Sequence, residues 1–548
     1  GCPPRELRHP RLTTAVAANV KRPALALPLD RWLLWLVLML PLAWMTWQYG
    51  AESVYYGEYL HWTGVQSARL LLLTLAVTPL FRLLPRTASR RGFLGASCAA
   101  PGGERRRGSF ALLHQGVVVM TDKATLVVGD RQYHLPVVEG SEGERGIDIR
   151  KLRDQSGLIT LDPGYGNTGS CQSAIAYIDG ERGILRYRGI PIEQFEQQPN
   201  FVEVAWLLIF GKLPSAHEYT RFSAQLTGNA NIDESMKHNF QGFPRAAPPM
   251  AILSAMINAL SCFHPELHEL EGPDQLEAAA ANLISKVRTI AAFAYRRSHG
   301  LAYMYPDPKL PYAANFLHMM FSQPYDEYLC DDRVRDALNL VLILHADHEQ
   351  NCSTSTVRMV GSSKANLFAS CAAGVCALWG PLHGGANVKV LDMLETIHQG
   401  RMTPEEYVQL AKDKSSKVRL MGFGHRVYKS FDPRAVVLQR TAERLLAFLG
   451  TDDPLLNIAR KLEEIALSDS YFVERKLYPN VDFYSGIILR AIGIPTNMFT
   501  VIFAIGRLPG WIAHWWEQHQ SPGGRIARPR QIYTGEALAD YRPLQDRN

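Results

Sequence analysis

The chain has 548 residues, 47% of them hydrophobic, which is enough for two or more folded units with a large buried core. Its formal net charge of +6 is uneven, because residues 1–116 carry 14 Lys and Arg against 5 Asp and Glu, and the rest carry 44 against 47. A nucleic-acid-binding surface needs a basic stripe on the folded domain, so we expect no nucleic acid as a partner. The eight cysteines are scattered with no Cys-x-x-Cys pair, which argues against a zinc site and favours free thiols.

Residues 1–30 form a basic segment, and residues 31–98 contain two apolar runs. Trp32–Ala51 is 20 residues without a charge, enough to cross a bilayer, and Leu70–Phe81 is a shorter run of 12. Arginines precede the first run and follow the second, so the positive-inside bias predicts a membrane hairpin over residues 31–84 with both ends in the cytoplasm. We therefore expect the remaining chain to be cytoplasmic and anchored to the inner membrane.

The sequences YLHWTG, RLLLLTLAVTPLFRLL and SRRGFLG within residues 31–98 resemble the start of ferric-reductase-like membrane proteins. The resemblance stops after two helices, and His61 alone cannot replace that family's paired haem-binding histidines, so no haem is expected. A gene fusion or a misread frame is the alternative origin of this segment. The alternative function that it implies is a membrane haem or redox subunit with the rest of the chain as a passenger.

The sequence PGGERRRG predicts a polar linker over residues 99–114. The apolar and polar residues that follow alternate around Gly129 and Asp130, which predicts a β-hairpin. A second hairpin is predicted over Ile175–Tyr187, with Asp179 and Gly180 at its turn. We expect a small β-rich module over residues 115–190.

From Pro191 onward, apolar residues recur at three- and four-residue spacing, which predicts helices nearly to the end of the chain. Residues 365–379 (ANLFASCAAGVCALW) have small residues at every turn, so they predict a closely packed central helix that ends at Gly380 and Pro381. No internal repeat and no GxGxxG loop occurs, so neither a solenoid nor a dinucleotide-binding fold is favoured. The expected fold class is mainly α, with a helical region over residues 191–540.

Two histidines stand in glycine-containing sequences. His383 lies in PLHGGAN, where the two glycines after it let a ligand approach the ring, although a helix-capping histidine is the plainer alternative. His425 lies in GFGHRVYKSFDPR, which ends at Arg434. An arginine and a histidine in one loop suit a substrate with a carboxylate and a ketone, because guanidinium binds the first and imidazole donates to the second. A solvated basic loop is the alternative.

Asp482 in LYPNVDFYSG stands before a helix predicted over Phe483–Ile492, where an aspartate is most often an N-cap. If Phe483 and Tyr484 limit its hydration, its carboxylate instead gains enough basicity to take a weakly acidic proton. His345 and His348, three residues apart, are predicted to share a helical face. Neither an HExxH motif nor a third ligand accompanies them, so no metal is expected.

These motifs resemble the citrate synthase family, in particular its bacterial type, over about residues 118–540. The resemblance implies large and small helical domains, with the small domain at roughly residues 390–495. It also implies an acyltransferase that condenses acetyl-CoA with oxaloacetate and hydrolyses citryl-CoA to citrate and CoA, a reaction of the tricarboxylic acid cycle. The nearest alternative is 2-methylcitrate synthase, which has the same fold and uses propionyl-CoA.

The resemblance also implies a role for each site residue. Asp482 would remove a methyl proton while His383 donates to the thioester oxygen, and His425 would donate to the ketone oxygen. The residues implied to hold oxaloacetate are His348, Arg434, Arg507 and Arg528, with His345 a packing neighbour of His348. Arg528 would come from a second subunit, so the assembly is at least a homodimer, with a hexamer as the larger alternative. Arg419 and Lys429 are candidates for the CoA phosphates, and no cofactor beyond the substrates is expected.

Many enzymes of this bacterial type are inhibited by NADH at a separate basic and aromatic site. The corresponding positions here are Gly228, Asn229, Ala230, His264, Asn282, Asp307 and Tyr325, and only Lys286 keeps the expected character. Because most cationic partners for a pyrophosphate are missing, the sequence predicts weak or absent inhibition by NADH.

Overall fold

The computed structural model describes residues 119–450, 453–522 and 524–547. The predicted basic segment, the membrane hairpin over residues 31–98 and the linker over residues 99–114 lie outside the described residues. Among the helices that are described, none is both long and apolar enough to cross a bilayer.

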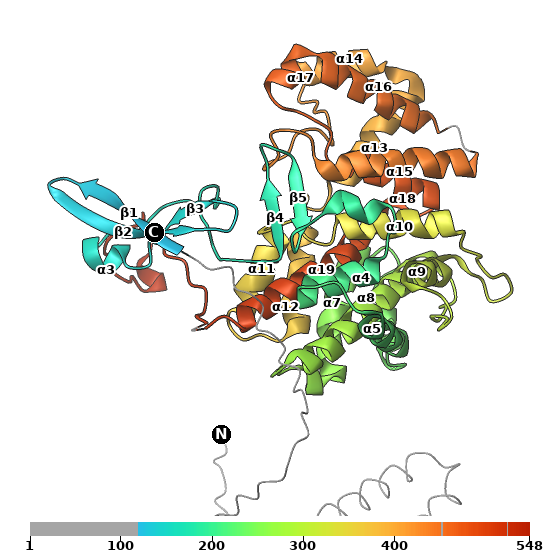
Figure 1. Ribbon diagram of the computed structural model, residues 1–548, viewed down its shortest axis with the longest axis horizontal. Helices are drawn as coiled ribbons and strands as arrows, with labels where there is room; N and C mark the ends of the chain where they lie inside the picture. Colours follow the sequence, from blue (N-terminus) through green and yellow to red (C-terminus); the bar gives the residue numbers. More distant parts are fainter. Residues whose placement is uncertain (1–118, 451–452, 523, 548) are drawn as a thin grey trace, which may run out of the picture. The chain divides into compact units, whose positions relative to one another are not determined.

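Two small antiparallel sheets begin the described chain (Figure 1). In the first, β2 (Arg131–Glu139) pairs with β1 (Val119–Val128) and with β3 (Arg145–Ile147). In the second, β5 (Ile184–Tyr187) pairs with β4 (Ala176–Asp179) and with β6 (Ile190–Pro191). Both predicted hairpins are confirmed, with turns at Gly129–Asp130 and at residues 180–183. The helix α3 (Leu152–Ser156) and a long loop separate the two sheets along the chain.

Helices make up most of the remaining chain, as predicted from Pro191 onward. After the short 3-10 helix η1 (Ile192–Glu196), the helices are α4 (Phe201–Phe210), α5 (Ala216–Gly228), α6 (Met236–Gln241), α7 (Pro249–Phe263), α8 (Pro273–His299), α9 (Tyr312–Phe321), α10 (Asp332–Leu344), α11 (Cys352–Gly361), α12 (Leu367–Leu378), α13 (Ala386–Thr396), α14 (Pro404–Lys412), α15 (Pro433–Leu449), α16 (Pro454–Ser468), α17 (Ser470–Glu474), α18 (Val481–Ile492) and α19 (Phe499–His519).

Beyond α19, the described residues 524–547 contain no α-helix, so the prediction of helix nearly to the end is wrong for this stretch. Its sequence explains the difference, because prolines and glycines in SPGGRIARPR break the helical pattern.

The helix α19 lies at the centre of the larger group of helices. It packs against α4, α8, α10, α11 and α12, and its residues from Phe499 to Trp516 are almost all buried. The predicted central helix of small residues is confirmed as α12, with Asn366 as its N-cap, and Gly374 lets Trp511 and Val357 pack directly against its backbone. This close packing fixes the backbone from which several site residues extend.

Helices α13 to α18 pack on one another and gather on one side of the described chain (Figure 1). The main contacts join α15 to α18, α13 to α18 and α14 to α16. The α15 helix also contacts α10 and η1, which belong to the earlier part of the chain. Loops at this junction carry the residues described next.

Candidate active site

His383 lies in a tight turn between α12 and α13. The backbone N–H of Ser353 donates to its Nε2 at 3.2 Å, and the Ser353 hydroxyl lies 2.9 Å from the same nitrogen. A ring nitrogen that accepts from an N–H carries no proton, so the proton of the neutral ring is on Nδ1. Burial, helped by the charge of Arg507, lowers the pKa of His383 to about 4, so the ring is a neutral donor at pH 7.

The glycine after His383 has a structural function that differs from the predicted one. A β-carbon on Gly384 would lie 2.3 Å from the carbonyl oxygen of Leu378, at the end of α12. The carbonyl of Gly384 accepts a hydrogen bond from the Thr500 hydroxyl at 2.8 Å. Gly384 thus lets the turn pack tightly between α12 and α19, which holds His383 in place.

His425 has the opposite arrangement of ring nitrogens. The backbone N–H groups of Val427 and Tyr428 donate to its Nδ1 at 3.0 and 3.2 Å, so the proton of the neutral ring is on Nε2. Burial and then the charge of Arg434 lower the pKa of His425 to about 4. The centroid of its ring lies 5.1 Å from that of His348 and 4.8 Å from that of Tyr428.

His345 and His348 do not share a helical face, so that prediction is wrong. The helix α10 ends at Leu344, His345 is its C-cap, and the chain then turns through Glu349, which has a positive φ. His348 is buried with its Nε2 3.2 Å from the Tyr428 hydroxyl, and burial holds its pKa well below the usual value. The ring of His345 packs against Phe503, with centroids 4.5 Å apart. Among the described residues, no group of His, Cys, Asp or Glu could hold a metal ion.

Arg434 is oriented by a buried ion pair. Its Nε and Nη2 donate to the two carboxylate oxygens of Asp432 at 3.0 and 2.8 Å, and both side chains are buried. Asp432 also caps α15 and accepts the N–H of Val481, at the start of α18, at 3.0 Å. Although burial opposes its ionisation, the Arg434 guanidinium holds the pKa of Asp432 below its usual value. One carboxylate therefore fixes an arginine and joins two loops of the site.

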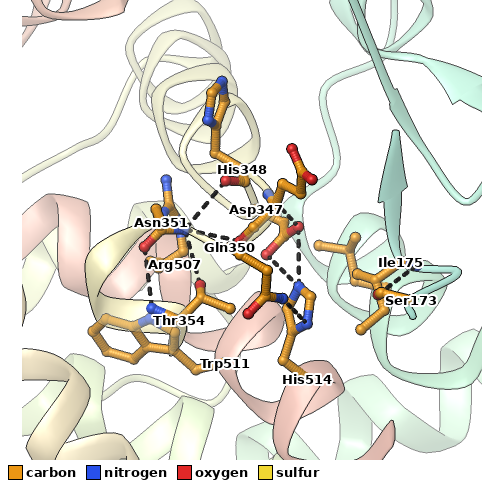
Figure 2. Close-up of polar contacts among 12 residues, drawn as sticks. Ser173, Ile175, Asp347, His348, Gln350, Asn351, Thr354, Arg507, Trp511 and His514 are labelled. Atoms are coloured by element: carbon orange, nitrogen blue, oxygen red, sulfur yellow. Dashed lines mark hydrogen bonds and ion pairs between the residues drawn. The ribbon is translucent and has the colours of Figure 1, made fainter. Parts of the chain in front are cut away.

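Arg507 extends from α19 toward the segment that carries His348 (Figure 2). Its Nε donates to the carbonyl oxygen of His345 at 2.5 Å, and burial lowers its pKa to about 10, so it stays charged at pH 7. Its buried Nη1 has no hydrogen-bond partner among the described residues. A buried charged donor without a partner destabilises the folded protein. An anionic ligand that accepted a hydrogen bond from Nη1 would remove this cost.

Asp482 lies in the first turn of α18, and this helix starts earlier than predicted. It begins at Val481, and the N-cap is Asn480, whose side chain accepts the N–H of Asp482 at 3.0 Å. Asp482 is therefore not the N-cap, and its carboxylate is free for another function. Burial raises its pKa to about 6, although the charges of Arg434 and Arg507 act in the opposite direction. This carboxylate is a stronger base than an ordinary aspartate.

Electrostatic interactions link the other predicted residues around the two buried arginines. The positive charge of Arg507 lowers the pKa values of His383, His348 and Asp482. The positive charge of Arg434 lowers the pKa values of His425, His348 and Asp482. Phe503 of α19 connects this group further, because its ring lies against His383, His345 and Arg507. The structure thus brings together six of the predicted site residues: His348, His383, His425, Arg434, Asp482 and Arg507.

The remaining three predicted residues are exposed. Arg528 lies in the extended segment after α19 and, within the described part of the chain, forms no hydrogen bond or ion pair with the buried arginines. Its neighbour Ala527 donates its N–H to the Ser362 hydroxyl at 2.9 Å, just after α11. Arg419 and Lys429 are exposed on the loops before α15, and neither forms an ion pair with another described residue.

Sequence reasoning missed several residues that support the site. Ser353 and Trp511 hold His383, since the indole N–H of Trp511 donates to the Ser353 hydroxyl at 3.2 Å. Tyr428 contacts both His348 and His425. Tyr428 stands three residues after His425 in the same motif, so it could have been found, whereas nothing local in the sequence connects Ser353 to His383.

Comparisons with known proteins identify the family of this chain. A family profile described as "Citrate synthase, C-terminal domain" matches residues 164–530. Citrate synthase 1 of Mycobacterium tuberculosis is 50% identical over 420 residues, covering 77% of this chain and 97% of the relative. Citrate synthase of Corynebacterium glutamicum is 51% identical over 435 residues, covering 78% and 99%.

Solved structures give the same result. Citrate synthase from Pyrobaculum aerophilum has a TM-score of 0.64 and 35% identity, covering 72% of this chain and 98% of that one. The Thermoplasma acidophilum enzyme, in a ternary complex with carboxymethyl coenzyme A and oxaloacetate, has a TM-score of 0.65 and 29% identity, covering 71% and 100%. The fold and these matches define an acyltransferase that converts an acyl group into an alkyl group on transfer. The chain belongs to the citrate synthase family.

Proposed function

We propose that the substrates are acetyl-CoA and oxaloacetate, and that Asp482, His383 and His425 carry out their condensation. Thioester methyl protons are very weakly acidic, so a base needs help from a donor at the developing oxyanion. Asp482 takes the methyl proton while the Nδ1–H of His383 donates to the thioester oxygen. The raised pKa of Asp482 and the proton position on His383 support this division of roles.

The enol formed in this way attacks the ketone carbon of oxaloacetate, a carbon–carbon bond forms, and the enol proton returns to Nδ1 of His383. The Nε2–H of His425 donates its proton to the ketone oxygen, which becomes the hydroxyl of citryl-CoA. The proton that Asp482 took from the methyl group balances the one that His425 gave up. His348, Arg434 and Arg507 hold the two carboxylates, and the unpaired Nη1 of Arg507 supports an anionic ligand there. Water then cleaves the thioester to give citrate and free CoA. Each imidazole acts as a neutral donor.

The observation that carries this proposal is that the two imidazoles carry their protons on opposite ring nitrogens, Nδ1 in His383 and Nε2 in His425. Backbone N–H groups bind Nε2 of His383 and Nδ1 of His425, so each ring keeps one N–H for a substrate. Release of CoA thiol from acetyl-CoA, dependent on oxaloacetate, tests the activity directly. Propionyl-CoA in the same assay tests the alternative 2-methylcitrate synthase activity. Turnover that favours propionyl-CoA would replace acetyl-CoA as the proposed substrate.

Arg528 fits a homodimer in which each subunit completes the site of the other. It lies in an exposed segment with large exposed apolar side chains, among them Ile526, Tyr533, Leu538 and Tyr541. Such side chains are typical of a segment that packs on a partner. Arg419 and Lys429 remain our candidates for the CoA phosphates, since both cations are exposed and neither forms an ion pair within the described chain, although Lys429 donates to the carbonyl oxygen of Arg426 at 3.3 Å. Sedimentation analysis would distinguish a dimer from a hexamer.

We also propose that NADH does not regulate this enzyme. At the positions that correspond to the family's NADH site, Lys286 donates to the carbonyl oxygens of Asn229 and Asn231 at 3.1 and 2.6 Å. Asn282 lies 3.3 Å from the Asn229 side chain. The one remaining cation is therefore engaged by the chain's own backbone. Saturable inhibition by micromolar NADH would contradict this proposal.

The membrane hairpin over residues 31–84 remains a proposal from the sequence. Fractionation of cells that express the full chain would test it, with CoA-thiol release measured in the membrane and soluble fractions. Activity found only in the soluble fraction with a shortened chain would refute the anchor.

A further inference from the structure

We infer that the β4–β5 hairpin is a positioning element that fixes His348 and His425 relative to each other. The inference rests on the roles proposed above for these two residues. The histidines come from segments about eighty residues apart in the chain, yet their ring centroids lie 5.1 Å apart. One short hairpin contacts both segments, with its base against the first and its tip against the second.

The base of the hairpin holds the segment that carries His348. The hydroxyl of Tyr187, in β5, lies 3.0 Å from the carbonyl oxygen of Ile343 and 3.1 Å from that of Asp347, and it accepts the N–H of Asp347 at 3.3 Å. Tyr187 is completely buried. Since Asp347 directly precedes His348, this hydroxyl fixes the backbone just before the histidine.

The tip of the hairpin holds the loop that carries His425. The carbonyl oxygen of Gly180 accepts the N–H of Lys429 at 2.8 Å. A β-carbon at Gly180 would lie 2.3 Å from the carbonyl oxygen of Val427, so only glycine allows this approach. The N–H groups that bind Nδ1 of His425 belong to Val427 and Tyr428, between the histidine and this contact. A shift of the loop at Val427 would therefore move the imidazole.

The hairpin between these two contacts is short and internally bonded. The strands pair from Ala176 opposite Tyr187 to Asp179 opposite Ile184. At the turn, the Asp179 carboxylate accepts the N–H groups of Glu181 and Arg182 at 3.0 and 2.9 Å. Glu181 also pairs with Lys476, at 3.1 Å, in the loop before α18. Because the turn is fixed, the distance from Tyr187 to Gly180 is fixed, and so is the spacing of the loops that they hold.

The test compares two variants with matched controls in the full chain. Tyr187→Phe keeps the ring and removes the hydroxyl, and Tyr177→Phe on the partner strand is its control, because the Tyr177 hydroxyl makes no hydrogen bond to another described residue. Gly180→Ala adds the obstructing β-carbon, and Gly169→Ala, where a β-carbon meets open space, is its control. Calorimetry with oxaloacetate alone gives its Kd, and CoA-thiol release gives kcat and the KM for acetyl-CoA. Active-site titration gives the folded, competent fraction.

We expect Tyr187→Phe to raise the Kd for oxaloacetate about tenfold. We expect Gly180→Ala to lower kcat about ten- to a hundredfold, since small misplacements of a reacting group have effects of this size. The KM for acetyl-CoA should stay within about threefold, and both controls should match the wild type.

Two results would overturn the inference. One is a wild-type Kd and kcat in both variants. The other is a loss explained entirely by a smaller competent fraction, with wild-type constants in the fraction that remains. His425→Gln is run alongside: if it keeps wild-type turnover, the proposed role of His425 fails. If His425→Gln loses turnover while Gly180→Ala does not, the positioning role of the hairpin tip is refuted and the proposed role of His425 stands.

Discussion

Replacing Asp482 with asparagine should greatly lower turnover and make the protein more stable at neutral pH. The carboxyl has a pKa of about 6 against an ordinary value of 3.8, because burial opposes its charged form. A folded-state pKa above the unfolded value means that the folded state is most stable when the group is protonated, below about pH 4, and loses stability as the pH rises through about 6. Asparagine stays neutral throughout, so it avoids this loss.

The structure gives the size of the effect. The difference between the folded-state pKa of about 6 and the ordinary value of 3.8 corresponds to at most about 3 kcal/mol in the free energy of unfolding at pH 7. Removing this loss should raise Tm by a few degrees. Thermal unfolding of wild type and Asp482→Asn at equal protein concentration, at about pH 7.5 and about pH 4, measures it. The gain in Tm should be present at about pH 7.5 and absent at about pH 4. Turnover should fall about a hundredfold or more.

A matched control is Asp392→Asn, at an exposed carboxylate on α13, which should leave Tm and turnover unchanged. The reasoning would be refuted if Asp482→Asn were less stable than the wild type at pH 7.5. It would also be refuted if the difference in Tm were the same at both pH values, because burial of the charge would then not be its cause.

Three other outcomes follow from the site. His425→Gln should lower kcat by about a hundredfold or more at an unchanged Tm, measured by CoA-thiol release, and retained turnover would exclude His425 as the donor. At low oxaloacetate, kcat/KM for acetyl-CoA should decrease as the pH is lowered through about 6, because Asp482 takes up a proton. A midpoint of this decrease near about pH 4 would contradict the raised pKa of Asp482. If Arg528 crosses to a partner, mixing Arg528→Ala with His425→Gln under conditions of subunit exchange should restore about a quarter of wild-type turnover, since half the dimers then hold one intact site. No recovery, with exchange verified, would place Arg528 in its own subunit or outside the site.

Local sequence patterns were sufficient for much of the fold. Alternating residues around Gly129–Asp130 and Asp179–Gly180 gave both hairpins, and helical periodicity gave the region from Pro191 to α19. The end of α10 was missed because the apolar pattern continues to Leu344 with polar residues after it, and nothing local shows that His345 caps the helix. What ends α10 there is tertiary, since Tyr187 binds the carbonyl groups of Ile343, in the last turn, and of Asp347, beyond the helix, and Arg507 binds that of His345.

Family resemblance, rather than spacing, was needed to choose the site residues. His383, His425 and Asp482 stand in separate motifs. Only the fold shows that Arg507 acts on His383, that Arg434 acts on His425, and that both act on Asp482. The pattern around Asp482 favoured an N-cap, and the structure assigns that role to Asn480 two residues earlier. The proton positions on the histidines depend on backbone N–H groups of Ser353, Val427 and Tyr428, which no sequence pattern specifies.

The two arginines that we propose to hold the keto acid, Arg434 and Arg507, also act on Asp482, the proposed base. Their charges lower the pKa of Asp482, against the larger effect of burial. When the dianion of oxaloacetate binds Arg434 and Arg507, it offsets part of their positive charge, so the pKa of Asp482 should rise further. A more basic carboxylate takes the methyl proton more readily, so acetyl-CoA is activated mainly when its reaction partner is already bound. The acid limb of the pH profile should accordingly lie at higher pH with saturating oxaloacetate than with little, and an unchanged limb would show that the arginines and the base act independently.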